Sequence, residues 1–212
     1  PTQIAIFDTL YATSLKNNTP ELTPSPFDKN RDGLVIGEGA GTLVLEEYEH
    51  AKKRGAKIYA EIIGFGTSTD GTHITNPNYK TMGKALELSL KDANISPDEI
   101  GYISAHGTGT YAGDIAETKA TEEIFKRPVP VSSLKSYTGH TLGACGSIEA
   151  IAAIDMMHRK WFNPTLNLNE VDNECGKLDY IKNQGREIDT NIVMSNNFAF
   201  GGINTSIIFK KI

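Results

Sequence analysis

The pattern of apolar and polar positions predicts strands and helices that alternate along most of the chain. Residues 58–66 alternate apolar with polar side chains, which is typical of a strand with one buried face. Residues 82–93 place Leu86, Leu90 and Ala93 at helical spacing. By the same reasoning we expect helices over 46–54 and 112–125, and strands over 42–45, 100–105, 129–132, 191–195 and 206–210. Strands that alternate with helices indicate a layered α/β fold.

Turn-forming and capping residues separate these elements. Gly55 follows the basic end of the helix over 46–54, where a helix commonly stops. The stretch Ser96-Pro-Asp-Glu99 is a capping box with proline at the first helical position, so a helical turn should begin there. Residues 24–41 are rich in Pro, Gly and Asp and have no sustained period, which predicts a loop.

The apolar run over 148–157 predicts a buried helix. Glu149 and Asp155 are its only charged residues, so the helix that we expect over 139–159 is apolar nearly all round. His140 would lie at or just before the first turn of this helix. There, unpaired N–H groups and the helix dipole disfavour a positive imidazole. We therefore expect a neutral ring, which can donate a hydrogen bond without acting as an acid.

Composition and charge narrow the class of protein. The chain has 212 residues and a formal net charge of −5, and we expect one globular domain without a basic field for nucleic acid. No window approaches eighteen consecutive apolar residues and the N-terminus does not resemble a secretory signal, so we expect no membrane span and a cytoplasmic location. Cys145 and Cys175 show no ligand or disulfide spacing and are expected to be free thiols.

Several motifs resemble ligand or catalytic sites, but a purely structural role explains each of them better. Residues 28–33 match the start of a calcium-binding EF-hand loop, but the twelfth position is Gly39 instead of glutamate. The glycines of residues 37–41 do not have the spacing of a dinucleotide-binding turn. Glycine turns are the only support for a third interpretation, in which the chain is an independent module that binds a small molecule. The five histidines show no metal-ligand spacing, so we expect no metal. Cys145 is interpreted as core packing, because Glu149 one turn later disfavours a thiolate.

Two histidines stand where an α/β fold collects its ligands. His106 ends the strand expected over 100–105, and His140 follows the strand expected over 129–132. Ligands bind outside the carboxyl ends of such strands, so both imidazoles could converge on one pocket. Two donors on one oxygen would form an oxyanion site.

Five stretches in the same order resemble the C-terminal half of a β-ketoacyl-acyl carrier protein synthase of the elongating type. They are residues 26–41, residues 43–61, Ala105-His-Gly-Thr-Gly-Thr110, Lys135-Ser-Tyr-Thr-Gly-His140 and Asn197-Phe-Ala-Phe-Gly-Gly-Ile-Asn204. The resemblance covers essentially all of residues 1–212, read as one C-terminal domain. It implies a thiolase-like α/β fold with a mixed sheet around a buried helix. It also implies decarboxylative Claisen condensation between an enzyme-held acyl group and a malonyl thioester, in fatty acid or polyketide-type synthesis.

The resemblance also implies roles for individual residues. The catalytic set would be His106 and His140, as donors to the malonyl thioester oxygen, with Lys135 supporting them electrostatically. Asp114, Glu117 and Glu149 would form a supporting charge network, for which ordinary ion pairing is the alternative. Thr108, Thr110 and the aromatic gate Phe200 would contact the substrate. The phosphopantetheine arm would arrive on an acyl carrier protein, so we expect no bound cofactor. A homo- or heterodimer is expected from the resemblance alone.

One departure from the family pattern limits this interpretation. The family's nucleophilic cysteine belongs to an N-terminal half, and its motif does not occur in these 212 residues. The chain would therefore need that half, from the same or another chain, to complete acyl transfer. Cys145, Asn197 and Ile203 also differ from the residues that the family often has at these positions. The alternative is a non-catalytic partner subunit, similar to a chain-length factor, although retention of both histidines weakens it.

Overall fold

A mixed six-stranded sheet lies at the centre of the computed structural model, which describes residues 2–212. Its strand order is β1-β8-β7-β2-β3-β5. Strands β1 and β7 run antiparallel to β8, whereas β7, β2, β3 and β5 run parallel. The strands are β1 (Glu61–Thr69), β2 (Tyr102–Ser104), β3 (Pro130–Ser132), β5 (Asp179–Tyr180), β7 (Ile192–Ala199) and β8 (Ile203–Lys210). A separate antiparallel pair joins β4 (Trp161–Phe162) to β6 (Arg186–Glu187).

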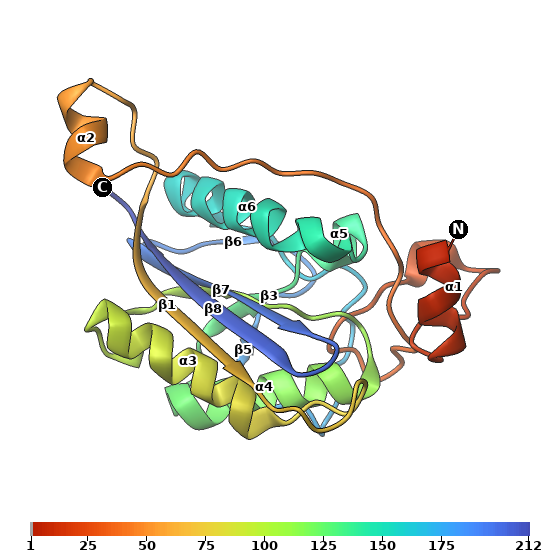
Figure 1. The fold of residues 1–212 in the computed structure, drawn as a ribbon. Coiled ribbons are helices and arrows are strands. Elements are labelled where there is room, and N and C mark those ends of the chain that lie inside the picture. The colour runs from red at the N-terminus through yellow and green to blue at the C-terminus, as the bar shows by residue number, and fades with distance from the viewer. Residues whose placement is uncertain (1) are drawn as a thin grey trace.

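Helices cover both faces of the sheet (Figure 1). Helices α3 (Tyr79–Ala93) and α4 (Tyr111–Phe125) cover one face, and α5 (Lys135–Thr138) and α6 (Cys145–Arg159) cover the other. Helix α1 (Thr2–Thr9) lies beside the turn between β7 and β8, and α2 (Tyr48–Lys53) lies at the opposite end of the molecule. Single 3-10 turns occur at Pro20–Leu22, Pro97–Glu99 and Leu142–Ala144. No helix among residues 2–212 is long and apolar enough to cross a membrane.

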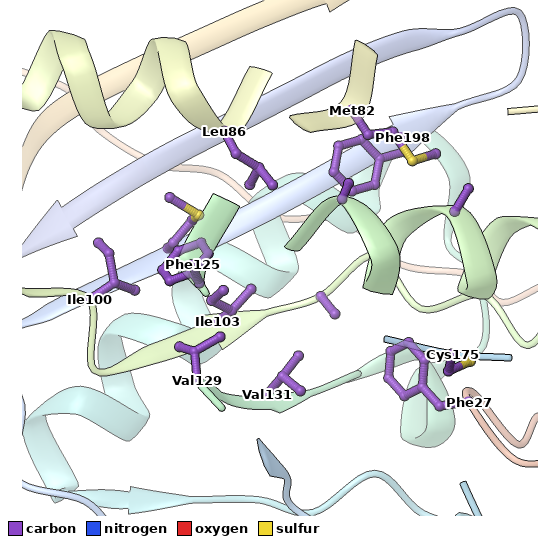
Figure 2. Close-up of a cluster of buried hydrophobic side chains, with 14 of the residues drawn as sticks. Phe27, Met82, Leu86, Ile100, Ile103, Phe125, Val129, Val131, Cys175 and Phe198 are labelled. Carbon is purple, nitrogen blue, oxygen red and sulfur yellow. The ribbon is translucent and has the colours of Figure 1, made fainter. Parts of the chain in front are cut away.

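The apolar core is divided by the sheet. The larger cluster fills the space between the sheet and helices α3 and α4, and Figure 2 shows Leu86, Ile103, Phe125 and Val131 converging there. The smaller cluster joins the sheet to α6 through side chains such as Tyr102, Ala153 and Met157, together with Phe162 and Phe209. Burying apolar surface contributes about 25 cal/mol per Å² removed from water, so these two clusters fix the helices on the sheet.

The structure confirms the layered α/β fold and most of the predicted elements, with differences at their ends. The long helix begins at Cys145 instead of 139, because Gly139 adopts a positive φ of 67° and a 3-10 turn follows. This helix is not buried all round, since Ile151 is 43% exposed. The strand expected over 42–45 forms no ladder within the described residues, and that segment instead passes, extended, along the outer side of α6 (Figure 1). The capping box at Ser96 is present as predicted.

Candidate active site

A cavity of about 950 Å³ opens at the ends of β2, β3 and β7 and at the start of α6. Its wall contains His106, His140, Cys145 and Asn197, and the apolar side chains around them come from α1, β1 and the β7–β8 hairpin. The two histidines that the sequence placed after neighbouring strands are therefore brought together. The following contacts fix each of them.

His106 lies directly after β2, on a loop that two buried acids hold. Both oxygens of Glu117 accept backbone N–H groups, from His106 and Gly107, at 2.7 Å each. Asp114 accepts the N–H groups of Thr108 at 3.0 Å and Gly109 at 3.2 Å. Buried N–H groups that find acceptors in this way hold a loop in one conformation, because leaving them unpaired would cost free energy. Helix α4 thus fixes the backbone that carries His106.

The partner of Asp114 differs from the one the sequence suggested. Arg31 lies 3.5 Å from Asp114 and also bonds Asp172 at 2.7 Å, and both ends of the Arg31–Asp114 pair are buried. Lys135 forms no ion pair with Asp114 or Glu117 in the described residues. Burial raises the pKa of Asp114 to about 6 and that of Glu117 to about 8. These two acids hold the loop after β2. Lys135 pairs directly with Glu149, while its charge reaches Glu117 from a distance and lowers the pKa of that carboxyl.

His140 is held by its own backbone and by the start of the next helix. Its N–H donates to the Val35 carbonyl at 2.7 Å, and its carbonyl accepts from Gly37 N–H at 3.0 Å. A Cβ at Gly37 would lie 2.1 Å from the Thr138 carbonyl oxygen, so only glycine permits this approach. The Leu142 N–H donates to the Nδ1 atom of the His140 ring at 3.1 Å. A free amide at the entrance of α6 therefore occupies one ring nitrogen.

Lys135 contacts the Nδ1 atom of His106 from the buried side of the ring. Its side chain is 1% exposed and forms a buried ion pair with Glu149 of α6. The Lys135 Nζ atom lies 3.1 Å from Nδ1 of His106. A lysine ammonium group can only donate, so Nδ1 of His106 is the acceptor. The sequence predicted Lys135 and Glu149 as partners in a supporting network, and the structure pairs them.

Both imidazoles are neutral near pH 7. Burial is the main cause that lowers the pKa of His106 well below its ordinary value, and the Lys135 charge lowers it further. Burial and Lys135 lower the pKa of His140 to about 3. Each Nδ1 accepts a hydrogen bond, so each proton resides on Nε2. The arrangement presents two N–H donors that can stabilise a negative oxygen without carrying a proton to it.

The predicted substrate contacts line the same cavity. The hydroxyls of Thr108 and Thr110 lie 2.9 Å apart at the N-terminal end of α4. Phe200 stands in the turn between β7 and β8, and its ring packs against Phe7 of α1 with the ring centroids 5.4 Å apart. All three are placed where a ligand in the cavity could touch them.

The sequence analysis did not predict that Asp28 and Arg31 are buried, or that Cys145 lines the cavity. Asp28 and Arg31, which belonged to the calcium-like motif, bond backbone groups and Asp172 instead, and no cluster of metal-ligand side chains occurs in residues 2–212. Their stretch was among the five family-like motifs, which was the available signal. Cys145 is buried, but it also lines the cavity and donates to Asn197 at 2.9 Å. Periodicity alone could not reveal that contact between α6 and β7.

Comparison with protein families identifies two adjoining matches. The model described as "Beta-ketoacyl synthase, C-terminal domain" matches residues 59–169, and the one described as "Beta-ketoacyl synthase, N-terminal domain" matches residues 1–51. Among curated proteins, the "3-oxoacyl-[acyl-carrier-protein] synthase 2" of Vibrio harveyi is 46% identical over 100% of this chain and 52% of its own length. The chain thus spans about half the length of the curated relatives it matches.

Solved structures give the same result for the fold. A β-ketoacyl synthase from Burkholderia phymatum STM815 is 60% identical, with a TM-score of 0.98 over 100% of this chain and 52% of the other. A ketosynthase solved in complex with a type II PKS acyl-carrier protein is 38% identical, with a TM-score of 0.93 over 100% of this chain and 53% of the other. The described residues therefore have the fold of the C-terminal half of these ketosynthases.

Proposed function

This chain belongs to the β-ketoacyl synthase family, and we propose that it supplies the decarboxylating half of a synthase active site. In this proposal the substrate is a malonyl thioester carried by an acyl carrier protein. The observation that carries the proposal is the pair of neutral rings, His106 and His140, whose Nδ1 atoms are both occupied and whose Nε2–H groups are left to donate. The fold is the thiolase-like one that the sequence predicted.

The chemistry requires donors of this kind. When the malonyl carboxylate leaves as carbon dioxide, the electrons of the broken C–C bond move onto the thioester, and its oxygen becomes an enolate. Preorganised donors stabilise this charge more than that of the neutral carbonyl, and so they lower the barrier. A removed donor of this type typically costs about 100- to 1,000-fold in rate. His106 and His140 would supply the two donors, and Lys135 would hold the tautomer of His106.

The enolate carbon would then attack an acyl group held as a thioester, and the thiolate of that thioester would leave. Neither cysteine of this chain suits that role. Burial is the main cause that raises the pKa of Cys145, and it raises the pKa of Cys175 to about 11. We propose that the part of the N-terminal domain that lies before the stretch matched by residues 1–51, in the same or a separate polypeptide, carries the nucleophilic cysteine.

An exposed apolar groove supports the need for that half. It lies between residues 42–60, which include α2, and helix α6, and its side chains include Val44 (82% exposed), Leu45 (69%), Tyr59 (58%) and Ile151 (43%). Exposed apolar surface of this kind marks an interface in a folded protein. Packing of the N-terminal half there would bury these side chains.

The carrier-protein partner is proposed on chemical grounds and by analogy. One structural neighbour was solved in complex with an acyl-carrier protein. In this proposal the hydroxyls of Thr108 and Thr110, which line the cavity, would bond the amides of a pantetheine arm, and Phe200 would cover the acyl group. We further propose a cytoplasmic location and a homo- or heterodimeric enzyme, as the family resemblance implies.

Intact mass spectrometry tests the division of labour. The native protein is incubated with an acyl thioester and separated under denaturing conditions. The proposal expects one acyl group on the part that contains the N-terminal half, and none on Cys145 or Cys175. Acylation of either thiol of this chain would contradict it. Binding of the carrier protein without malonyl decarboxylation would instead favour the chain-length-factor-like subunit.

A further inference from the structure

Asn197 of β7 contacts two side chains of α6, Cys145 and Glu149, that lie one helical turn apart. Its Nδ2 atom donates to Oε2 of Glu149 at 3.1 Å, and its Oδ1 atom accepts from the Cys145 thiol at 2.9 Å. Both partners belong to the first two turns of α6, and Asn197 and Cys145 line the cavity that contains the histidines. The amide therefore links the sheet to the entrance of the helix at the reacting site.

The contacts of Asn197 extend to His106 through buried groups. Glu149 uses its second oxygen, Oε1, for the ion pair with Lys135, so both of its oxygens are bonded. Lys135 in turn donates to Nδ1 of His106. Glu149 and Lys135 are 2% and 1% exposed, respectively, so water does not screen these interactions. The order of contacts is Cys145, Asn197, Glu149, Lys135 and His106.

The thiol and the Glu149 carboxylate together determine which way the amide faces. An inverted amide would direct its oxygen at the Glu149 carboxylate and place two acceptors in contact. Burial raises the pKa of Cys145, so the thiol keeps its proton and acts as the donor that Oδ1 needs. With Oδ1 fixed in this way, Nδ2 must point at Glu149. A side chain that ends at the γ position, such as serine, has one hydroxyl for both partners and could not bond them in the same way.

We propose that Asn197 is a positioning residue for decarboxylation, held in its orientation by Cys145, and that it acts on His106 through Glu149 and Lys135. This inference rests on the proposed function. Asn197 restrains the carboxylate, the carboxylate fixes the ammonium group, and the ammonium group keeps His106 as the Nε2–H tautomer. Burial and the charges of Lys135 and His140 lower the pKa of His106, whereas a side-chain hydrogen bond with Asn197 raises it, so Asn197 also acts on the ring directly.

The Asn197→Asp variant gives a readout that a purely structural role would not give. The titratable groups that face position 197 are Cys145 and Glu149 on α6, Lys135 on α5 and His106 after β2. Two ionised carboxylates would repel each other and draw Lys135 away from His106. A protonated carboxyl at 197 can donate to Glu149 as the amide does. We therefore expect malonyl decarboxylation by the complete synthase to fall at least about tenfold at pH 8 and to recover as the pH falls to 6.

Matched variants and a second measurement complete the test. Cys145→Ala should lower kcat by about two- to fivefold with little change in KM, because it removes the donor that holds Oδ1 and leaves the contact with Glu149 in place. Cys175→Ala is the control and should match the wild type. Nitrogen-15 NMR of histidine-labelled enzyme should give one Nε2–H tautomer for His106 in the wild type and a mixture of tautomers in Asn197→Asp.

The outcomes separate this inference from the proposed function. Wild-type rates, a flat pH profile and unchanged His106 ring shifts in Asn197→Asp would overturn the positioning role. An inactive wild-type synthase would overturn the proposed function, and the ring shifts would still decide whether Asn197 controls the tautomer. If Asn197→Asp unfolds, Asn197→Ser replaces it: lower kcat at unchanged KM supports the inference, and an unchanged kcat contradicts it.

Discussion

The rings of His106 and His140 meet edge to face, with their centroids 5.1 Å apart and their planes at 85°. His106 follows β2 and His140 follows β3 after a short helix, and these strands are parallel neighbours in the sheet. The carboxyl ends of parallel neighbours lie at one edge, which is why two residues 34 positions apart share a cavity. Each ring receives a hydrogen bond at Nδ1 from a different source, an ammonium group for one and a backbone amide for the other.

The protonation state of the pair leads to a prediction about pH. His140 has a pKa of about 3, and the pKa of His106 lies well below its ordinary value. Both depressed values mean that the neutral forms persist as the pH falls through 6.5. The rate of malonyl decarboxylation should therefore show no histidine inflection between about pH 5 and 8. A pH–rate profile of the complete enzyme checks this, and a loss of activity centred near pH 6.5 would contradict it.

The buried pair of Lys135 and Glu149 predicts a strong asymmetry between single and double substitutions. Lys135→Met leaves the Glu149 carboxylate buried without its cation, which should cost about 3–5 kcal/mol of stability. Replacing both residues, as Lys135→Met with Glu149→Leu, removes both desolvated charges and should regain most of that loss. Denaturant unfolding of the four proteins measures the coupling. Additive effects of the two substitutions would show that the pair does not act as a unit.

Glu117 should make the folded protein less stable as the pH rises. Burial raises its pKa from 4.5 to about 8, so the folded protein binds this proton more tightly than the unfolded chain. The resulting stability is complete below about pH 4.5 and is lost as the pH rises through 8. We expect the unfolding midpoint of the wild type to fall between pH 6.5 and 8.5 by more than that of Glu117→Gln. Asp114, with a pKa of about 6, titrates mostly below this window. Parallel curves for the two proteins would refute the assignment.

Substitution of Gly37, which lies outside the catalytic set, should disturb the backbone that holds His140. A Cβ there would lie 2.1 Å from the Thr138 carbonyl oxygen, so the backbone that bonds His140 must move. Gly37→Ala should therefore destabilise the protein by about 1–3 kcal/mol and lower the decarboxylation rate. Gly143→Ala is the matched control for stability, because a Cβ at Gly143 meets nothing within 4 Å. Equal unfolding midpoints for the two variants would argue against this steric account.

The sequence predicted the elements whose burial repeats with a fixed period. Helix α3 was expected from Leu86 and Leu90, and both are buried where the period placed them. Helix α4 was harder to predict in detail, since Asp114 and Glu117 are as buried as Ala116 and Ala120. Their burial is tolerated because loop N–H groups from the preceding turn bond them, and no amphipathic pattern encodes such partners.

The sequence predicted the two histidines of the site but only some of the residues that hold them. The positions of His106 and His140 followed from the ends of two strands, which is local information. The ion pair of Arg31 with Asp114 spans 83 positions, and the contact between Cys145 and Asn197 spans 52. These contacts depend on how separate elements pack. The unpaired segment 42–45 failed as a strand for a related reason, because a ladder needs a neighbour and none lies beside it in the described residues.

Malonyl decarboxylation by His106→Ala tests the central claim most directly. The complete synthase, carrying either His106→Ala or the exposed-residue control His50→Ala, is given malonyl thioester on carrier protein, and released carbon dioxide is measured. His50 is suitable because its side chain is 68% exposed and, within residues 2–212, lies near one acid, Glu46, at 3.5 Å. The donor pair predicts a loss of about 100-fold or more for His106→Ala and a wild-type rate for the control. A His106→Ala enzyme that decarboxylates at the wild-type rate would contradict the account.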